Sequence, residues 1–241
     1  MNKLSVAIPL KTSSMRVRNK NLRPFVDGKS LFDLKAEQLL KLFDPGDVYV
    51  SSENPKAEEA VRKYGFNFLI RDVALTKPNA AWGEVIKDIV NQIPAGNDIV
   101  WTQVTQPLFD EFDKVMETWQ RVKDNHDSLA VVKKFSHHLI DASGNPVNFN
   151  YGYWHKQSQE LPSFYQLTWA CFVMKRQMVE SCWYNIGKTP YLYDTAAPLV
   201  DIDTDQEFEI ASILYKHYKA HSAPKLTVTS ARTEVQVSAI K

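Results

Sequence analysis

Cationic side chains cluster near the start of the chain in a pattern suited to binding phosphate. Residues 11–23 contain five lysines and arginines and no acidic residue. They follow an apolar run, residues 4–10, that predicts a strand buried on both faces, and open α/β sheets bind ligands beyond the carboxyl ends of such strands. Ammonium, guanidinium, hydroxyl and backbone N–H groups in one turn would neutralise a polyphosphate. The alternative is a solvated basic loop, because runs of charge usually lie on the surface. The charges alone leave both interpretations open.

Two aspartates near the other end of the chain form a second candidate site. Asp201 and Asp203 are two residues apart in an apolar segment that we predict to be a strand. Residues two apart on a strand share a face, so both carboxylates would point to one side while Ile202 faces the core. Paired carboxylates suit Mg²⁺, a hard cation that also binds phosphate oxygens. The alternative is a helix-entry turn in which Thr204 and Glu207 form a capping box.

Strand-like and helix-like patterns alternate with short links through most of the chain. This alternation predicts a doubly wound α/β fold with a mostly parallel sheet. The pattern breaks near residue 135, where many aromatic side chains follow with no clear period. We therefore expect an α/β domain formed by residues 1–134 and 196–222, an insertion (135–195) that packs against the sheet and carries a dimer interface, and a C-terminal tail (223–241). The expected strands are 4–10, 47–51, 66–70, 98–102, 128–132, 169–174, 191–193 and 199–203, and the expected helices are 31–42 (N-capped by Ser30), 55–64, 81–93, 110–123 and 206–219.

The composition limits the class of protein. The 241 residues are 44% hydrophobic and 24% charged, typical of a soluble globular protein, and the net charge is +1. We therefore expect neither nucleic acid nor a membrane as a partner, and no apolar run reaches the roughly 18 residues of a membrane helix. Two cysteines, Cys171 and Cys182, form neither a disulfide framework nor a metal motif. Because the first residues also lack signal-peptide character, we expect a cytoplasmic protein of enzyme size.

The basic loop resembles a known nucleotide-binding motif. Residues 8–22 read I-P-L-K-T-S-S-M-R-V-R-N-K-N-L and are similar to the I-P-A-R-G-G-S-K-R-I-P-G-K-N-L loop of the acylneuraminate cytidylyltransferase family, the CMP-sialic acid synthetases and their relatives. The chain departs from that pattern at Lys11, where the family has arginine, and at Thr12 and Ser13, where it has glycines. The resemblance implies a nucleotide site formed by Pro9, Lys11, Ser14, Lys20, Asn21 and Arg71.

The acidic segment resembles the closing motif of the same family. Residues 201–209 read D-I-D-T-D-Q-E-F-E and are similar to D-I-D-T-x-x-D-L-E, whose carboxylates bind the catalytic Mg²⁺. The resemblance implies that Asp203 is the principal metal ligand. It implies that Asp201 is the second ligand or helps to deprotonate the acceptor hydroxyl, with Lys20 as the third catalytic residue.

The acceptor side of the expected site departs further from the family. Residues 100–108 resemble L-L-Q-P-T-S-P-L-R, which implies that Gln103 contacts the acceptor. Gln159 and Tyr165 are further acceptor-binding candidates, although the aromatic residues of this region would equally serve to pack the insertion. Three positions that carry arginine in the family are Phe109, Gln157 and Ser158 here. Because these cations are missing from the expected acceptor side, the sequence favours a less anionic acceptor or a different binding mode.

The resemblance implies a nucleotide-diphospho-sugar transferase (Rossmann-like) fold with an inserted dimerisation and acceptor subdomain. It also implies a Mg²⁺-dependent cytidylyltransferase that joins CMP from CTP to an acceptor and releases pyrophosphate. The acceptor would be a nonulosonic acid, such as sialic, legionaminic or pseudaminic acid, or another sugar acid, and the protein would be a homodimer. CMP transfer to a divergent acceptor, a nucleotide-sugar glycosyltransferase and a non-catalytic nucleotide-binding relative are the alternatives. The hypothesis requires the basic loop and the two aspartates to meet at one triphosphate.

Overall fold

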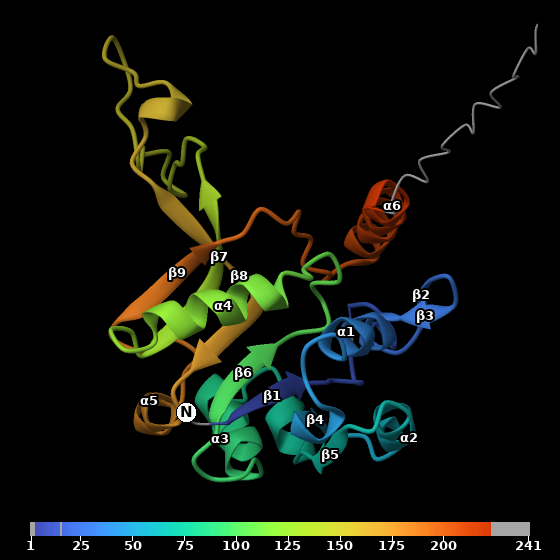
Figure 1. Cartoon of the computed structure of the whole chain (residues 1–241). Coiled ribbons are helices and arrows are strands. Elements are labelled where there is room, and N and C mark those ends of the chain that lie inside the picture. The colour runs from blue at the N-terminus through green and yellow to red at the C-terminus, as the bar shows by residue number, and fades with distance from the viewer. Residues whose placement is uncertain (1–2, 15, 223–241) are drawn as a thin grey trace, which may run out of the picture.

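One seven-stranded sheet, in the order β5-β4-β1-β6-β8-β7-β9, forms the centre of the computed structural model, which describes residues 3–14 and 16–222 (Figure 1). Its neighbouring strands are parallel except for β6·β8 and β7·β8, which are antiparallel. The mostly parallel sheet predicted from the sequence is therefore confirmed, whereas the expected tail, 223–241, lies outside the described residues. The strands are β1 (Leu4–Pro9), β4 (Val48–Ser52), β5 (Asn67–Ile70), β6 (Asp98–Thr102), β7 (Ser128–Phe135), β8 (Phe164–Met174) and β9 (Pro190–Asp194).

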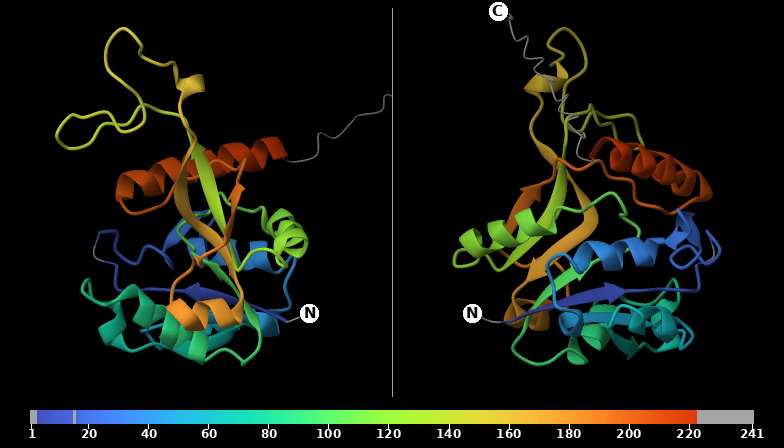
Figure 2. Two further views of the ribbon diagram at one scale, coloured as in Figure 1. Left: turned by 90° about the vertical axis from the view of Figure 1, so that its left-hand side faces the viewer. Right: turned by 45° about the vertical axis from the view of Figure 1, so that its right-hand side comes forward.

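Helices cover both faces of this sheet (Figures 1 and 2). Alternate residues of β1 face opposite sides: Val6 and Ile8 belong to the buried cluster that includes residues of α1, α4 and α6, whereas Ala7 belongs to the cluster that includes residues of α3 and α5. None of the helices in the described part of the chain combines the length and the apolar character needed to cross a membrane. The helices are α1 (Leu31–Leu39), α2 (Ala57–Arg62), α3 (Trp82–Asn91), α4 (Phe112–Val122), α5 (Arg176–Cys182) and α6 (Asp205–Ser222), with 3-10 helices η1 (Pro45–Asp47), η2 (Val73–Thr76) and η3 (Ser158–Glu160).

The first helix begins at the predicted cap. The Ser30 hydroxyl accepts a hydrogen bond from the Asp33 backbone N–H at 3.1 Å, and the Asp33 carboxylate accepts one from the Ser30 backbone N–H at 2.8 Å. This capping box satisfies two backbone donors that the helix itself leaves unpaired. The Tyr64 hydroxyl also donates to Asp33 at 2.5 Å, which ties the cap to the end of α2.

A small hairpin lies in the segment that the sequence predicted as a loop. Strands β2 (Pro24–Val26) and β3 (Lys29–Ser30) are joined by Asp27 and Gly28, both at positive φ. Phe25 of this hairpin packs edge-on against Phe208 of α6, with ring centroids 5.0 Å apart. The contact brings the C-terminal helix beside the segment that follows β1.

The predicted strand over residues 199–203 is wrong. This segment has no regular structure and crosses from the end of β9 to the start of α6. Its backbone forms a hydrogen bond to a loop and not to a strand: the Ile202 N–H donates to the carbonyl of Thr105, in the loop after β6, at 3.1 Å. Ile202 is nevertheless fully buried, as the sequence predicted.

The sheet recruits strands from the region expected to be an insertion. Residues 135–195 include β8 and β9, and β8 lies within the sheet between β6 and β7. Period alone did not reveal the first half of β8, because its burial changes from exposed to buried along its length. Cys171 on this strand is fully buried, as expected for a core residue.

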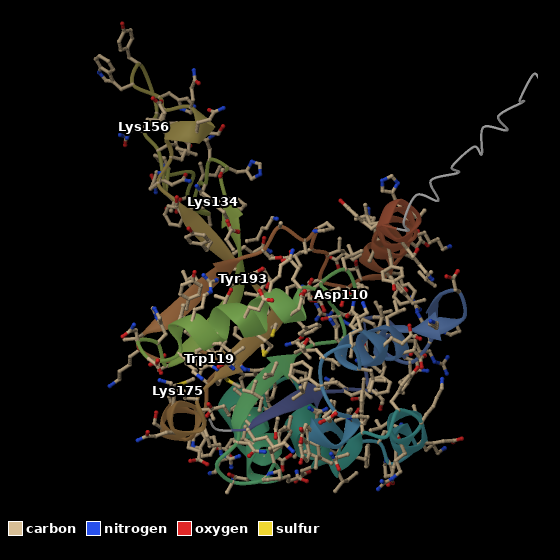
Figure 3. The ribbon with its side chains drawn as sticks, in the orientation of Figure 1. Asp110, Trp119, Lys134, Lys156, Lys175 and Tyr193 are labelled. Carbon is tan, nitrogen blue, oxygen red and sulfur yellow. The ribbon has the colours of Figure 1, made fainter. Side chains whose placement is uncertain are left out.

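Residues 136–163 form an arm that extends away from the sheet (Figures 1 and 2). The arm continues the paired ends of β7 and β8, where Phe135 lies opposite Phe164. Lys134 lies at its base and Lys156 further out (Figure 3). Its outer part exposes large aromatic side chains, with Tyr153 91% and Trp154 80% exposed.

Candidate active site

A cleft of about 920 Å³ opens beyond the carboxyl ends of β1, β5 and β6. Its volume is in the range of small-molecule sites, and its position is the one expected for a ligand of a doubly wound sheet. Residues from both ends of the chain line it. The structure brings together nine of the predicted site residues here: Pro9, Lys11, Ser14, Lys20, Asn21, Arg71, Gln103, Asp201 and Asp203.

The basic loop and the acidic segment meet directly in this cleft. The Lys20 ammonium lies 3.2 Å from a carboxylate oxygen of Asp203 and donates a short hydrogen bond to the Ile202 carbonyl. Arg16 pairs with the same carboxylate oxygen of Asp203 at 3.0 Å. Lys20 is only 8% exposed, so its charge is held inside the wall of the cleft rather than in bulk water. The basic loop and the carboxylate pair therefore share one cleft, as the sequence hypothesis requires.

The carboxylate pair is presented by the turn that precedes α6. The Thr204 hydroxyl accepts from the Glu207 N–H at 3.2 Å, and the Glu207 carboxylate accepts from the Asp203 and Thr204 N–H groups at 2.9 and 2.8 Å. The capping box considered as an alternative from the sequence is therefore real, and it coexists with the carboxylate pair. Glu207 satisfies the backbone and leaves Asp203 free to face Lys20. Partial desolvation of the Asp201 carboxyl, with the nearby Asp203 charge, raises its pKa.

The donor set of this turn fits Mg²⁺. Asp201 and Asp203 both line the cleft and supply carboxylate oxygens, the ligand type that this cation prefers. Within residues 3–14 and 16–222 no three or more His, Cys, Asp or Glu side chains are grouped to hold a metal ion. A divalent cation here would therefore need substrate oxygens in addition to the two carboxylates, which is how Mg²⁺ usually binds with phosphorylated ligands.

Glu53, which the sequence did not indicate as a site residue, organises the basic loop. One oxygen of its carboxylate accepts hydrogen bonds from the Thr12 N–H, the Thr12 hydroxyl and the Ser13 N–H, each at 2.9 Å. Partial burial raises the pKa of the Glu53 carboxyl, but the hydrogen bonds from these donors outweigh that effect and lower the pKa to about 2. Thr12 and Ser13 replace the family's glycine pair, and their N–H groups here are taken by a carboxylate of the protein itself.

Arg71 lies against the other oxygen of Glu53. Its guanidinium is 3.3 Å from that oxygen, and its side chain is only 4% exposed although it lines the cleft. Burial lowers the pKa of Arg71, and the Glu53 charge counters this effect. The Nε–H of Arg71 has no hydrogen-bond partner among the residues that the structure describes. A buried donor that lacks a partner at a cleft wall is suited to an incoming acceptor atom.

Lys11 and Asn21 fix the start of the same loop. The Asn21 amide donates to the Lys11 carbonyl at 2.8 Å, and the Lys11 ammonium donates to the Thr76 carbonyl at 2.6 Å. Asn21 is 6% exposed, and its side-chain oxygen is buried without a partner in the described ranges. Asn21 therefore shapes the loop, while Lys11 spans from β1 to η2 at the edge of the cleft.

The predicted acceptor residues separate into two groups. Gln103 lines the cleft. Gln159 lies in η3 on the arm and Tyr165 lies at the base of the arm, and neither is among the described residues that line the cleft. Phe109 is fully buried and packs edge-on against Phe112, 5.1 Å between centroids. Position 109 thus belongs to the core, and Phe109 is not among the described residues that line the cleft.

Three aromatic side chains of the cleft escaped the sequence analysis. Trp82, Trp169 and Tyr184 all line it and come from separate parts of the chain. Trp82 and Trp169 meet edge-on with centroids 5.7 Å apart. No local spacing signals this group, because its members come from α3, from β8 and from the segment after α5.

The basic loop after the first strand and the carboxylates before the last helix share one cleft of a doubly wound sheet. This arrangement indicates an α/β nucleotidyltransferase. Residues 6–211 match the model of the cytidylyltransferase family. The chain belongs to this cytidylyltransferase family and is a nucleotidyltransferase that uses CTP. Family membership thus favours nucleotidyl transfer over the glycosyltransferase alternative.

Several known proteins are similar along most of the chain. Pseudaminic acid cytidylyltransferase of Campylobacter jejuni is 24% identical in an alignment of 224 residues that covers 87% of this chain and 94% of that protein. The solved structure of CMP:2-keto-3-deoxy-manno-octonic acid synthetase complexed with CTP has a TM-score of 0.61 at 14% identity, covering 90% of this chain and 100% of the other. The 4-diphosphocytidyl-2C-methyl-D-erythritol synthase of Anaerococcus prevotii has a TM-score of 0.60 at 8% identity, covering 89% and 99%. The two solved structures show that the fold is shared.

Proposed function

We propose that this cytidylyltransferase transfers CMP from CTP to a nonulosonic acid, with Mg²⁺ at Asp201 and Asp203. The contact between Lys20 and Asp203 carries the proposal, because it places a cation beside the carboxylate pair in a cleft beyond the sheet. The similar pseudaminic acid cytidylyltransferase supports an acceptor of this class. The acceptor hydroxyl oxygen would bond to the α-phosphorus as the bond to pyrophosphate breaks.

The cationic residues of the cleft would bind the triphosphate, and the two aspartates would bind Mg²⁺. Lys11, Arg16 and Lys20 bring three cations to the cleft, where they would neutralise the triphosphate and take up the charge that builds on the departing pyrophosphate. Mg²⁺, when bound, would withdraw charge from the α-phosphate and favour ionisation of the hydroxyl. Asp203 would hold it as the principal ligand. Asp201 would be the second ligand or take up the proton of the hydroxyl.

The nucleotide would lie against the loop that Glu53 organises. Pro9, Ser14 and Asn21 line the cleft beside Lys11, and Arg71 presents a buried Nε–H donor without a protein partner in the described chain. These groups favour a ligand with several acceptor oxygens. Gln103, at the end of β6, would contact the acceptor.

The arm supports the proposal of a homodimer. Its tip exposes Tyr153 and Trp154, and such apolar exposure is typical of a surface that another protein covers. Gln159 and Tyr165 could serve an acceptor only if the arm reaches the cleft of a second copy. Light scattering on the purified protein tests this directly, and a monomeric mass at working concentration would contradict it.

Asp203→Asn, with Asp205→Asn as the matched control, tests the carboxylate assignment. Asp205 also pairs with an arginine of the N-terminal segment, Arg23, at 2.8 Å, but it does not line the cleft of the described chain. We expect D203N to lower kcat for pyrophosphate release by roughly 100-fold or more, and D205N to change it little, since exposed ion pairs contribute little. Thermal unfolding would verify that both variants fold.

The same assay identifies the acceptor. CTP and Mg²⁺ are supplied with pseudaminic acid, sialic acid, legionaminic acid or 2-keto-3-deoxy-manno-octonic acid, and pyrophosphate is measured. Turnover with any of the first three supports the proposed class. CTP binding without turnover on the whole panel would instead favour a divergent acceptor, and near wild-type turnover by D203N would refute the metal assignment.

A further inference from the structure

The cleft has a second wall of different chemistry from the basic loop. Trp82, Trp169 and Tyr184, hereafter the aromatic wall, line it from the start of α3, from β8 and from the segment after α5. In the sheet, β6 lies between β1 and β8. The loop after β6, which carries Gln103, therefore lies between the phosphate-binding side and the side of Trp169.

Trp169 has a backbone conformation that is unusual for its size. Its φ is +57°, in the left-handed region that bulky side chains rarely adopt. The residue lies in a bulge, because Ala130 of β7 pairs with Phe172 whereas Val132 pairs with Leu167, which leaves residues 168–171 opposite Val131. Bulges near sites commonly redirect a side chain, and this one directs an indole into the cleft.

Hydrogen bonds on both sides of Trp169 hold this conformation in place. The Thr168 hydroxyl donates to the Val131 carbonyl at 2.7 Å, in place of the interrupted ladder. The Gln106 amide donates to the Thr168 carbonyl, and the Thr102 hydroxyl donates to the Ala170 carbonyl, each at 2.7 Å. Strained residues persist where surrounding contacts determine them this fully, and they cluster at ligand sites.

The neighbouring indole is fixed as well. Trp82 donates its Nε1–H to the side-chain oxygen of Asn185 at 2.8 Å, and Asn185 is fully buried. Its ring meets Trp101 of the core edge-on at 5.7 Å and Trp169 at the same distance. Because its polar atom is already satisfied, Trp82 presents apolar surface to the cleft. Tyr184, 39% exposed, extends this surface.

We propose that the aromatic wall is the part of the acceptor site that selects an acceptor with acyl or methyl substituents, and that Trp169 is its specificity-determining residue. This inference rests on the proposed function, because it assigns the acceptor rather than the nucleotide to this side of the cleft. Rigid apolar rings gain affinity from apolar groups and leave additional hydroxyl groups without partners. Pseudaminic acid carries acylamino groups and a terminal methyl group, whereas 2-keto-3-deoxy-manno-octonic acid carries hydroxyl groups in their place.

Trp169→Gly tests the proposal, because glycine adopts the observed φ without strain and removes the ring. The wild-type protein should use pseudaminic acid with a kcat/KM at least roughly tenfold above that for 2-keto-3-deoxy-manno-octonic acid. W169G should raise KM for pseudaminic acid by roughly tenfold or more, reduce the preference between the acids, and leave KM for CTP within about twofold. Trp169→Asn, which also suits a left-handed φ, serves as a second variant if W169G folds poorly.

Trp183→Gly is the matched control. Trp183 is also a tryptophan in the left-handed region, with φ +49° at the end of α5, but it does not line the cleft of the described chain. W183G should retain the wild-type preference between the acids. A rise in KM for CTP in W169G with unchanged KM for pseudaminic acid would overturn the proposal, since the ring would then contact the nucleotide.

A binding measurement separates this inference from the proposed function. Protection from thermal unfolding by pseudaminic acid, with CMP present, requires no turnover. Protection that W169G abolishes, without pyrophosphate release by the wild type, would support the aromatic wall and refute the proposed reaction. Turnover of pseudaminic acid with the same KM in W169G and wild type would support the proposed reaction and refute the role of the aromatic wall. If none of pseudaminic, sialic and legionaminic acid protects the wild type or is consumed by it, both the inference and the proposed function fail.

Discussion

Replacing Lys35 by methionine should change how the stability of the protein depends on pH. Lys35 lies on α1 and is fully buried, with its ammonium nitrogen 3.2 and 3.3 Å from the carbonyl oxygens of Gln106 and Phe109. Burial is the main cause that lowers its pKa from 10.5 to about 7, while Cys171 and Asp110 oppose the shift. The residue thus supports the loop that carries Gln103, but it does so at an electrostatic cost.

The sign and size of the effect follow from this pKa. Between pH 7 and 10.5 the unfolded chain holds a proton on Lys35 that the folded chain has released, so the free energy of unfolding rises with pH in this window. Each pH unit is worth about 1.4 kcal/mol, so the full window amounts to at most roughly 5 kcal/mol. Above pH 10.5 the side chain is uncharged in both states, so K35M differs from the wild type only by the loss of two hydrogen bonds. We expect K35M to be less stable than the wild type there by about 1–3 kcal/mol.

Urea unfolding of both proteins at pH 7, 8.5 and 10, with a reducing agent, measures this difference. The stability of K35M relative to wild type should be highest at pH 7 and should fall by about 1.4 kcal/mol per pH unit as pH rises. Lys41→Met is the control, because Lys41 lies just beyond the same helix with its side chain 63% exposed. A difference between K35M and wild type that does not vary from pH 7 to 10 would refute the argument.

Two further substitutions test the contacts that shape the site and the first helix. Glu53→Gln should raise KM for CTP and lower stability at neutral pH. Because the folded pKa of Glu53 is about 2 against the ordinary 4.5, this loss should be fully present above pH 4.5 and shrink as pH falls toward 2. Urea unfolding at pH 7 and 3 measures it, and a loss equal at both would contradict the assigned ionisation. Tyr64→Phe removes the hydroxyl that donates to Asp33, and it should cost about 1 kcal/mol of stability without changing kcat. A large kcat effect would show that α1 and the cleft are coupled.

Much of the sheet could be predicted because its strands are short apolar runs in an alternating chain. The strand from Asp98 to Thr102 and the N-cap at Ser30 were both predicted from local sequence and are confirmed. The hairpin at Asp27 and Gly28 and the first part of β8, residues 164–168, were missed, whereas residues 169–174 of β8 were predicted as a strand. β8 pairs with partners far away in the sequence, and its first three residues are exposed whereas its last five are buried, so no single period describes it.

The site was predictable where motifs are local and not where contacts are distant. Lys20 and Asp203 each belong to a short motif, and the structure brings them within 3.2 Å. Asp201 and Asp203 reach the cleft without the strand that the spacing predicted, because the cap formed by Thr204 and Glu207 orients the turn instead. Glu53 and Trp169 were not assigned to the site from the sequence, since their roles depend on the partners that the fold supplies.

The sequence by itself determined the alternating architecture, the cationic loop, the acidic turn and the resemblance to the cytidylyltransferases, because each is encoded within a few consecutive residues. The tertiary structure alone decided that Glu53 occupies the N–H groups of the basic loop, that position 109 faces the core, and that Trp82 and Trp169 form one wall. These features depend on contacts across forty or more residues of chain, and such contacts are fixed by strand order and packing rather than by local pattern.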